Sequence, residues 1–386
     1  MTSAVLPVFK RFPVSFVRGE GVYLYDDTGK KYLDFGSGVA VNALGHCHPK
    51  LVKALETQGN ALWHCSNWYE IPAQEHLAKT LTEASFADYA FFGNSGAEAI
   101  ECGIKMVRAF FSHRNEPNRY TIITCNNSFH GRTFGAISAM GRSGFEPTLP
   151  GFVHVPYGDI EALKAAITPY TAAVLLEPIQ GEGGVNPARL DYLQAVRALT
   201  QQHGMLLFLD EIQTGIGRTG KLFAYEWAGI APDIVASAKG LGGGFPIGAC
   251  LATAHGASGM LAGMHGSTFG GNPLACVVAS AVLEEILQPE FLPQVDKVAR
   301  VLWHKLVELI PASNSVFTAV RGAGLLLGLQ CRDNNIDVTK ALLKKGLLVV
   351  PAWDNVIRLL PPLIINEQHI DEALAILTAY KDNPDA

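Results

Sequence analysis

The chain has 386 residues, of which 48% are hydrophobic and 17% are charged, and its formal net charge is -5. This length suggests two packed units with a large apolar core. The low net charge excludes the basic surface of a nucleic-acid-binding protein and the polybasic patch of a membrane-surface protein, so the expected partner is a small molecule.

Cysteine usage and the N-terminal sequence favour a cytoplasmic protein. The seven cysteines are odd in number and lack paired spacing, which is typical of free thiols in a reducing compartment. The first residues show no signal-peptide pattern, and no segment contains the about 18 consecutive apolar residues that a transmembrane helix needs. We therefore expect neither secretion nor membrane insertion.

The predicted elements begin with a hairpin at residues 21–35, where two alternating strands surround an Asp-Thr-Gly turn. From residue 45 to about residue 270, apolar β-rich runs alternate with helical stretches. The strand candidates are residues 121–124, 172–176, 205–209 and 234–236. Since these strands are apolar on both faces, the pattern predicts an α/β fold with a mostly parallel sheet covered by helices.

After Pro273 the pattern changes to that of a second, smaller α/β unit. Residues 274–287 form a long apolar helix candidate, and short strands are expected at 325–330 and 347–350. We therefore expect three units: an N-terminal arm and hairpin over residues 1–44 that pack with the small domain, a large domain over 45–273, and a small C-terminal domain over 274–386.

Lys239 and Asp210 are the most informative pair in the chain. Asp210 closes the apolar run at 205–209, and Lys239 follows 29 residues later in a glycine-rich segment. Either residue alone is more often a turn former or a solvated loop residue. Together they meet two requirements of pyridoxal phosphate chemistry, because an amine must attach the cofactor aldehyde and a carboxylate must keep the pyridine nitrogen protonated.

A candidate phosphate site precedes this pair in the chain. Ser95 and Glu98 have the spacing of a capping box, and a helical run to about Phe111 follows. A well-capped helix alone explains the pattern equally well. Such a helix start also exposes backbone N–H groups at the positive end of the helix dipole, which suits a phosphate monoester.

Two other phosphate-binding motifs do not fit. A P-loop is excluded because no Gly-Lys-Ser/Thr closes the motif. Gly242-Gly243-Gly244 lacks the strand–turn–helix setting of a dinucleotide site.

Residues 128–133 follow the strand candidate at 121–124, so they should lie at the carboxyl edge of the sheet, where α/β proteins bind ligands. Phe129 could cover one face of a pyridine ring, and Arg132 could bind a substrate carboxylate through two parallel hydrogen bonds. Either side chain could instead be packed in the interior or lie on the surface.

Glu182 and Arg358 are charged residues in glycine-rich or apolar surroundings. A charge in such surroundings is costly unless it is paired or faces a cleft. The two residues therefore either line a site or bridge the domains.

His46, Cys47 and His48 are of types that ligate zinc. Structural zinc sites usually pair ligands separated by about two to four residues and repeat that pair downstream, and this chain has no such second pair. We expect no metal here and interpret the segment as a loop that enters a helix at Pro49.

Several motifs, spread over nearly the whole chain, resemble those of the class III, fold type I pyridoxal-phosphate aminotransferases. These motifs are Leu44-Gly45-His46-Cys47-His48-Pro49, Asn94-Ser95-Gly96-Ala97-Glu98-Ala99, Phe129-His130-Gly131-Arg132-Thr133, Glu177-Pro178-Ile179-Gln180-Gly181-Glu182-Gly183-Gly184, Asp210-Glu211-Ile212-Gln213, Ser237-Ala238-Lys239 and Ser267-Thr268-Phe269-Gly270-Gly271-Asn272-Pro273. The resemblance implies the fold type I architecture, pyridoxal 5'-phosphate as cofactor, and a homodimer with shared active sites.

The resemblance also implies a role for each site residue. Lys239 would attach the cofactor, and Asp210 would pair with its ring nitrogen. The other implied cofactor contacts are Ser95, Gly96 and Ala97 at the phosphate, Phe129 on the ring, Gln213 at the ring hydroxyl, Glu211, and Thr268 reaching the phosphate in the neighbouring subunit. The implied substrate contacts are Arg132 at the α-carboxylate, Ser267, and the pair Glu182 and Arg358, in which the glutamate masks the arginine for one substrate and releases it for the other.

Within the family, the resemblance implies the acyl-ornithine branch. The expected reaction moves the terminal amino group of N2-acetyl-L-ornithine to 2-oxoglutarate, giving N-acetyl-L-glutamate 5-semialdehyde and L-glutamate in arginine biosynthesis. N-succinyl-diaminopimelate is a possible further substrate. The alternatives are a succinylornithine, ornithine or 4-aminobutyrate aminotransferase and, more remotely, a non-catalytic regulatory protein of the same fold, against which the retention of Lys239 and Asp210 argues.

Two positions depart from the family pattern. Phe9 stands where a tyrosine is common, and Trp68 stands where an aliphatic residue is common. We expect both near the substrate mouth, where they bear on the acyl group that is accepted.

Overall fold

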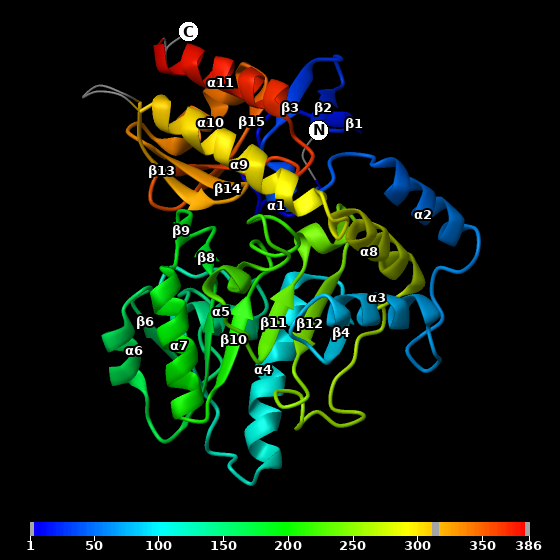
Figure 1. The fold of residues 1–386 in the computed structure, drawn as a ribbon, viewed down its shortest axis with the longest axis vertical. Coiled ribbons are helices and arrows are strands. Elements are labelled where there is room, and N and C mark those ends of the chain that lie inside the picture. The colour runs from blue at the N-terminus through cyan, green and yellow to red at the C-terminus, as the bar shows by residue number, and fades with distance from the viewer. Residues whose placement is uncertain (1–3, 311–315, 383–386) are drawn as a thin grey trace.

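The computed structural model describes residues 4–310 and 316–382, and its larger part is built on a seven-stranded sheet (Figure 1). The strand order is β4-β12-β11-β10-β7-β5-β6. The strands are β4 (Tyr89–Gly93), β5 (Thr121–Cys125), β6 (Phe152–Val155), β7 (Thr171–Leu176), β10 (Leu206–Asp210), β11 (Ile234–Ser237) and β12 (Gly248–Ala252). Neighbours from β6 to β11 are parallel, whereas β12 is antiparallel to both β11 and β4. The predicted mostly parallel sheet is confirmed.

The reversal at β12 follows from the short connection before it. β11 ends at Ser237 and β12 begins at Gly248, with only the 3-10 turn η2 (Lys239–Gly242) between them. A parallel return needs a crossover of about a dozen or more residues, usually a helix. The chain therefore turns back antiparallel, and Lys239 stays at the edge of the sheet where β10 and β11 end.

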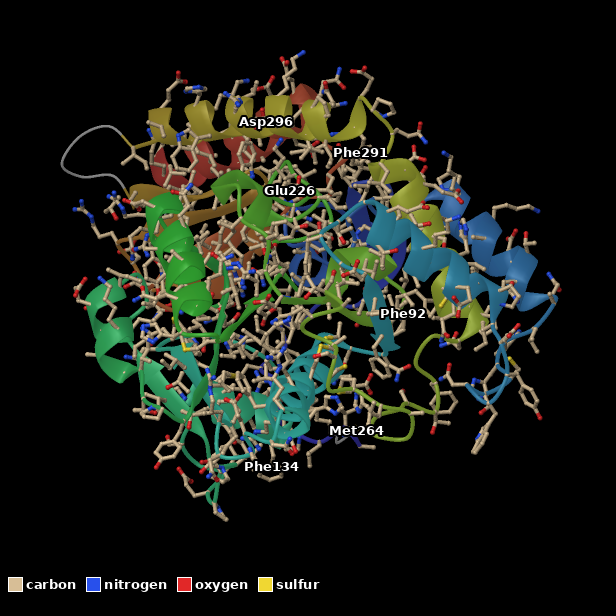
Figure 2. All side chains as sticks on the ribbon, turned by 60° about the horizontal axis from the view of Figure 1, so that its bottom comes forward. Phe92, Phe134, Glu226, Met264, Phe291 and Asp296 are labelled. Atoms are coloured by element: carbon tan, nitrogen blue, oxygen red, sulfur yellow. The ribbon has the colours of Figure 1, made fainter. Side chains whose placement is uncertain are left out.

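The apolar strands of this sheet are buried on both faces. Ala173 and Leu175 of β7 face one apolar cluster, and the alternating Val174 and Leu176 face the other. Side chains fill the space between the sheet and its helices (Figure 2). The first face is covered by α4 (Gly96–His113) and α5 (Phe134–Met140), and the second by α6 (Ile160–Ala166) and α7 (Leu190–Gln202).

The smaller part of the molecule, at the top of Figure 1, carries a four-stranded sheet of order β13-β14-β17-β16. Its strands are β13 (Phe317–Ala323), β14 (Leu326–Cys331), β16 (Val350–Ala352) and β17 (Val356–Leu359). Its helices are α9 (Phe291–Glu308), α10 (Asn335–Lys344) and α11 (Glu367–Asp382), and α8 (Pro273–Ile286) leads from the larger part to them.

The N-terminal hairpin joins this smaller part through a second sheet, of order β1-β2-β3-β15. Leu33 in the third strand pairs with Leu347 in the parallel strand β15. The strands are β1 (Phe16–Glu20), β2 (Tyr23–Asp26), β3 (Lys31–Asp34) and β15 (Leu347–Leu348). The remaining elements are α1 (Ser37–Ala40), α2 (Pro49–Gly59), α3 (Pro72–Glu83), β8 (Ile179–Gln180), β9 (Asn186–Pro187) and η1 (Ala224–Ala228).

Most predicted elements are confirmed with boundaries shifted by one residue, as for the helix expected at 274–287 that spans Pro273–Ile286. The single strand expected at 347–350 was wrong. It is split because Leu347–Leu348 pairs with β3, whereas Val350–Ala352 pairs with β17 in the other sheet.

The free thiols expected from the cysteine spacing are confirmed, since all seven cysteines are unpaired. Within residues 4–310 and 316–382, no helix has the length and apolar character needed to cross a membrane. The same residues contain no group of three or more His, Cys, Asp or Glu side chains that could hold a metal ion.

Candidate functional site

A cavity of about 840 Å³ lies where β10 and β11 end, and side chains from both sheets line it. It brings together most of the residues singled out from the sequence. These are Ser95, Gly96, Ala97, Phe129, Arg132, Glu182, Asp210, Gln213, Lys239 and Arg358. The cavity therefore joins the candidate phosphate site, the Lys239 and Asp210 pair, and the two charged residues whose position was left open.

Asp210 is fixed in the cavity by two hydrogen bonds. Its Oδ2 lies 2.7 Å from Nδ1 of His130, and its Oδ1 accepts from the backbone N–H of Ile212 at 3.0 Å. Asp210 is 3% exposed and His130 is 1% exposed. A buried imidazole that donates to a carboxylate fixes the orientation of that carboxylate.

Lys239 begins η2 directly beyond β11, with a positive φ of 45°. Parallel pairing aligns Asp210 of β10 with Ala236 of β11. Asp210 and Lys239, which follows β11, therefore lie at the same edge of the sheet. Burial, together with the cation of Arg358, lowers the pKa of Lys239 from 10.5 to about 8. A substantial fraction of this amine is therefore neutral near physiological pH.

Glu177 is a further buried carboxyl group on the cavity wall. Burial raises its pKa well above the usual range, and the neighbouring carboxylate of Asp210 adds to this rise. Its Oε2 accepts from the backbone N–H of Phe129 at 3.3 Å. Both causes favour the neutral form of the Glu177 carboxyl group.

The first turn of α4 faces the cavity with small residues. Ser95 caps the helix by accepting from the N–H of Glu98 at 3.3 Å, as the capping-box spacing predicts. The reciprocal contact is shifted, because the carboxylate of Glu98 accepts from the N–H of Asn94 instead of from that of Ser95. Gly96 and Ala97 lie in the first turn, where backbone N–H groups have no partner within the helix and are available to an anion.

Arg358 and Glu182 form an ion pair inside the cavity, with Nη2 2.6 Å from Oε2. Arg358 is 1% exposed, and it also donates to Oε1 of Gln213 at 3.3 Å and to the carbonyl of Pro351 at 3.2 Å. Burial lowers the pKa of Arg358, and Glu182 opposes that shift. The pair lines the cavity, and it also links the turn after β8 to β17 of the small sheet.

Three expected contacts do not line the cavity. Glu211 is fully buried, and its carboxylate accepts from the N–H groups of Ala224 and Tyr225 at 3.0 and 2.9 Å. Ser267 lies outside and accepts from the side chain of Asn94 at 3.2 Å, and Thr268 is exposed. Of the two departures from the family pattern, Phe9 lines the cavity, whereas Trp68 is 90% exposed and does not.

His130 and Glu177 are not among the site residues predicted from the sequence. Glu177 directly follows β7, and His130 lies in the loop between β5 and α5; both belong to the motifs that suggested Phe129 and Glu182. The available signal was a polar residue in the same motif as a candidate site residue. The sequence alone, however, does not show which residues of a motif face the ligand.

The cavity thus combines a buried amine of lowered pKa, an oriented carboxylate and a helix N-terminus. This is the donor set that an aldehyde on a phosphorylated pyridine ring would need. The fold and the site therefore define an α/β enzyme in which a lysine would attach the cofactor.

Comparison with known proteins places the chain more closely. Residues 7–380 match the family model described as Aminotransferase class-III, and the chain belongs to this family of pyridoxal-phosphate-dependent enzymes. It is 53% identical to the acetylornithine aminotransferase of Agrobacterium fabrum, covering 98% of this chain and 97% of the relative. It is 51% identical to the enzyme of the same name from Rhodobacter capsulatus, covering 98% of each chain.

Solved structures agree with this family. The N-acetylornithine aminotransferase of Stenotrophomonas maltophilia is similar with a TM-score of 0.85 and 39% identity, over 96% of both chains. The ornithine aminotransferase of Toxoplasma gondii is similar with a TM-score of 0.92 and 32% identity, over 98% of this chain and 93% of that one. The fold type I aminotransferase architecture expected from the sequence is confirmed.

Proposed function

We propose that this protein transfers the terminal amino group of N2-acetyl-L-ornithine to 2-oxoglutarate, giving N-acetyl-L-glutamate 5-semialdehyde and L-glutamate, as in arginine biosynthesis. The observation that carries the reaction class is the meeting of Lys239 and Asp210 at one edge of the sheet, inside the cavity that also holds Arg358. The choice of amino donor is supported by relatives at 51% and 53% identity that are acetylornithine aminotransferases.

The residues present fit pyridoxal phosphate. Asp210 would hold the ring nitrogen, Phe129 would cover the ring, and the first turn of α4 would bind the phosphate with Ser95 and the N–H groups of Gly96 and Ala97. When bound, the cofactor supplies an electron-accepting ring that stabilises negative charge on the substrate carbon bearing the amino group.

The protein's own contribution is positioning and proton transfer. Lys239 Nζ, when neutral, accepts the proton from the substrate carbon that bears the transferred amino group. Its pKa of about 8 suits this task, since a base works best when its pKa lies near the working pH. Asp210 is held in orientation by its contact with His130.

Substrate carboxylates meet two arginines in this proposal. Arg132 would bind the α-carboxylate of either substrate through its planar fork. Arg358 would bind the distal carboxylate of 2-oxoglutarate or glutamate after Glu182 moves aside. Acetylornithine has no second carboxylate, so Glu182 would stay paired with Arg358 while this substrate is bound.

We also propose a cytoplasmic homodimer in which Thr268 reaches the neighbouring subunit's phosphate site. Thr268 is exposed in the isolated chain, and nearby large apolar side chains are exposed too: Trp63 by 67%, Trp68 by 90% and Phe269 by 61%. Exposed apolar clusters of this kind commonly mark protein–protein interfaces. Analytical ultracentrifugation should give a dimer, and a monomeric active enzyme would contradict the shared site.

The experiment that tests the substrate is a panel of amino donors with 2-oxoglutarate as acceptor. We expect acetylornithine to give the highest kcat/KM, with succinylornithine and N-succinyl-diaminopimelate tested for the tolerated acyl group. Ornithine is the second candidate, because the ornithine aminotransferase of Toxoplasma gondii has a TM-score of 0.92. A preference for free ornithine or 4-aminobutyrate would overturn the proposal.

A spectrum tests the cofactor separately. The protein with pyridoxal phosphate should show a visible band that acetylornithine removes and that is absent from Lys239→Ala. A band unchanged in Lys239→Ala would remove the assignment of this lysine, and no band at all would favour a non-catalytic protein.

A further inference from the structure

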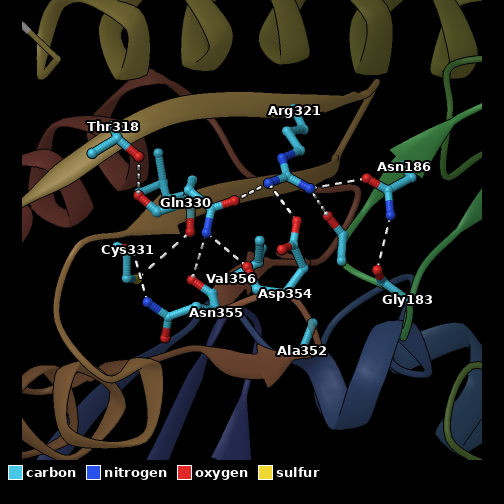
Figure 3. A network of polar contacts seen from close by, with 12 residues as sticks. Gly183, Asn186, Thr318, Arg321, Gln330, Cys331, Ala352, Asp354, Asn355 and Val356 are labelled. Carbon is cyan, nitrogen blue, oxygen red and sulfur yellow. Dashed lines mark hydrogen bonds and ion pairs between the residues drawn. The ribbon is translucent and has the colours of Figure 1, made fainter. Parts of the chain in front are cut away.

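Glu182 lies in the turn of a hairpin formed by β8 and β9, and both ends of this turn contact the small sheet. At the start, the Glu182 carboxylate binds Arg358 and its carbonyl accepts from the N–H of Trp353 at 2.9 Å. At the end, Nη1 of Arg321 donates to the carbonyl of Gly184 at 3.2 Å and to Oδ1 of Asn186 at 2.9 Å (Figure 3). The turn is therefore held by two arginines.

These two arginines occupy one row of the small sheet. Arg321 on β13 lies opposite Gly328 on β14, and Gly328 lies opposite Arg358 on β17. Residues directly opposite each other in antiparallel strands project from the same face. Arg321 and Arg358 therefore flank Gly328 on the face that meets the hairpin turn.

Val185 of the turn fills the space above Gly328. A Cβ on Gly328 would lie 2.9 Å from the Cβ of Val185, which leaves no room for a side chain at that position. Val185 is fully buried and has a φ of 54°, a left-handed conformation that is unfavourable for a β-branched residue. Such a conformation persists only when the surrounding contacts impose it.

Arg321 is itself held firmly. Its Nη2 lies 2.7 Å from Oδ2 of Asp354 and also contacts Oε1 of Gln330 (Figure 3). Gln330 in turn donates to the carbonyl of Asp354 at 2.7 Å. These contacts aim the guanidinium fork at the turn, so Arg321 acts as an anchor that does not itself reach the cavity.

We propose that Arg321 is a positioning residue for substrate selection, which anchors the far end of the turn so that Glu182 stands against Arg358. This inference rests on the proposed function, because it assigns the Glu182–Arg358 pair to alternation between two substrates. A dicarboxylate must displace Glu182 from Arg358, and a turn without its anchor opposes that displacement less. Loss of the anchor therefore favours dicarboxylates over the monocarboxylate amino donor.

The test compares Arg321→Met with the parent holoenzyme, using glutarate as a dicarboxylate that cannot react. We expect glutarate to inhibit about 3- to 10-fold more tightly in the variant, and KM for acetylornithine to rise while kcat changes little. Arg321→Lys should lie between them, because one ammonium group lacks the planar fork that contacts both Gly184 and Asn186. Arg300→Gln removes an exposed arginine paired with Asp296 on α9 and should match the parent.

Amide hydrogen exchange gives a readout that does not depend on activity. Residues 181–186 should exchange faster in Arg321→Met than in the parent and in Arg300→Gln. Parent-like exchange in the turn, or faster exchange with an unchanged glutarate constant, would overturn the inference. Should Arg321→Met fail to fold, Asn186→Ala removes the acceptor on the turn and is measured in the same way.

The two proposals fail in different ways. If the parent protein transfers no amino group from acetylornithine to 2-oxoglutarate, the proposed substrate is wrong. If the parent is active and Arg321→Met keeps the parent's glutarate constant, only the role of Arg321 is wrong.

Discussion

His130 Nδ1 lies 2.7 Å from Oδ2 of Asp210, and the two side chains are 0% and 3% exposed. The imidazole therefore donates to a carboxylate that is almost fully buried. Nε2 of His130 has no hydrogen-bond partner among the described residues, so the contact with Asp210 is the one that fixes the ring. In the proposed reaction, His130 would act through Asp210 as a positioning residue.

Substitution of His130 should weaken the reaction without abolishing it. His130→Phe removes a hydrogen bond to a charged group, worth about 1.5–3 kcal/mol, so we expect kcat to fall by about 10- to 100-fold. His130→Asn keeps a donor and should recover part of the loss. Stopped-flow measurement of the half-reaction with acetylornithine checks this, and equal losses in both variants would indicate that the donor is irrelevant.

The pKa of Lys239 makes a prediction for cofactor loading. Only the neutral amine attacks an aldehyde, and a pKa of about 8, instead of 10.5, places its deprotonation near pH 8. The rate at which cofactor-free protein binds pyridoxal phosphate should therefore rise with pH up to about 8 and level off above it. A rate that still climbs at pH 10 would contradict the lowered pKa.

Replacing Arg358 should raise the pH at which the rate of cofactor loading is half of its maximum. The cation of Arg358 lowers the pKa of Lys239, and its removal also leaves the nearby negative charge of Glu182 unpaired, which favours the protonated amine. Arg358→Leu should thus load cofactor with a midpoint above pH 8. The exposed pair of Arg300 and Asp296 supplies the control, because Arg300→Gln should leave the midpoint unchanged.

Substitutions in the Glu182–Arg358 pair should affect the two half-reactions differently. In Glu182→Ala, Arg358 is permanently free, so we expect 2-oxoglutarate to bind more tightly and acetylornithine to react more slowly. In Arg358→Leu, the lost charge-assisted contact of about 1.5–3 kcal/mol should raise KM for 2-oxoglutarate by about 10- to 100-fold. Single-turnover rates for each substrate test this, and parallel losses for both substrates in either variant would argue against a gate.

Helix α4 offers a stability prediction with a matched control. A Cβ on Gly103 would lie 2.2 Å from the ring of Phe208, so Gly103→Ala should destabilise the protein by about 1–3 kcal/mol. A Cβ on Gly59, at the end of α2, would meet nothing within 4 Å. Gly59→Ala should therefore be neutral or stabilising by up to about 1 kcal/mol. Urea denaturation of the two variants measures the difference in free energy of unfolding.

The sequence predicted the parts of the site that depend on neighbouring parallel strands. Asp210 ends β10 and Lys239 follows β11, and parallel strands bring their carboxyl ends to one edge whatever lies between them. The same reasoning placed Phe129 correctly beyond β5. Apolar runs also located the buried strands, because a strand that is buried on both faces shows no alternation of polar and apolar residues.

Contacts between distant segments could not be predicted in this way. Arg358 reaches Gln213 across 145 residues, and periodicity within either segment does not report the other. The division of residues 347–352 between two sheets depends on which partner strand is present, and the segment's own sequence does not state it. Glu211 follows Asp210 directly but turns into the interior to accept from Ala224 and Tyr225, which only the fold decides.

The row formed by Arg321, Gly328 and Arg358 belongs to strands of the small sheet, whereas Lys239 and Asp210 belong to the edge of the large one. Arg321 and Arg358, to which we assign roles in substrate selection, therefore lie in a different stretch of the chain from Lys239 and Asp210. An exchange of β13, β14 and β17 with those of a relative should redirect donor preference while leaving the catalytic lysine in place. Because these strands are separate from the loop that carries Lys239, substitutions in them should alter the proposed substrate contacts while the edge of the large sheet keeps its geometry.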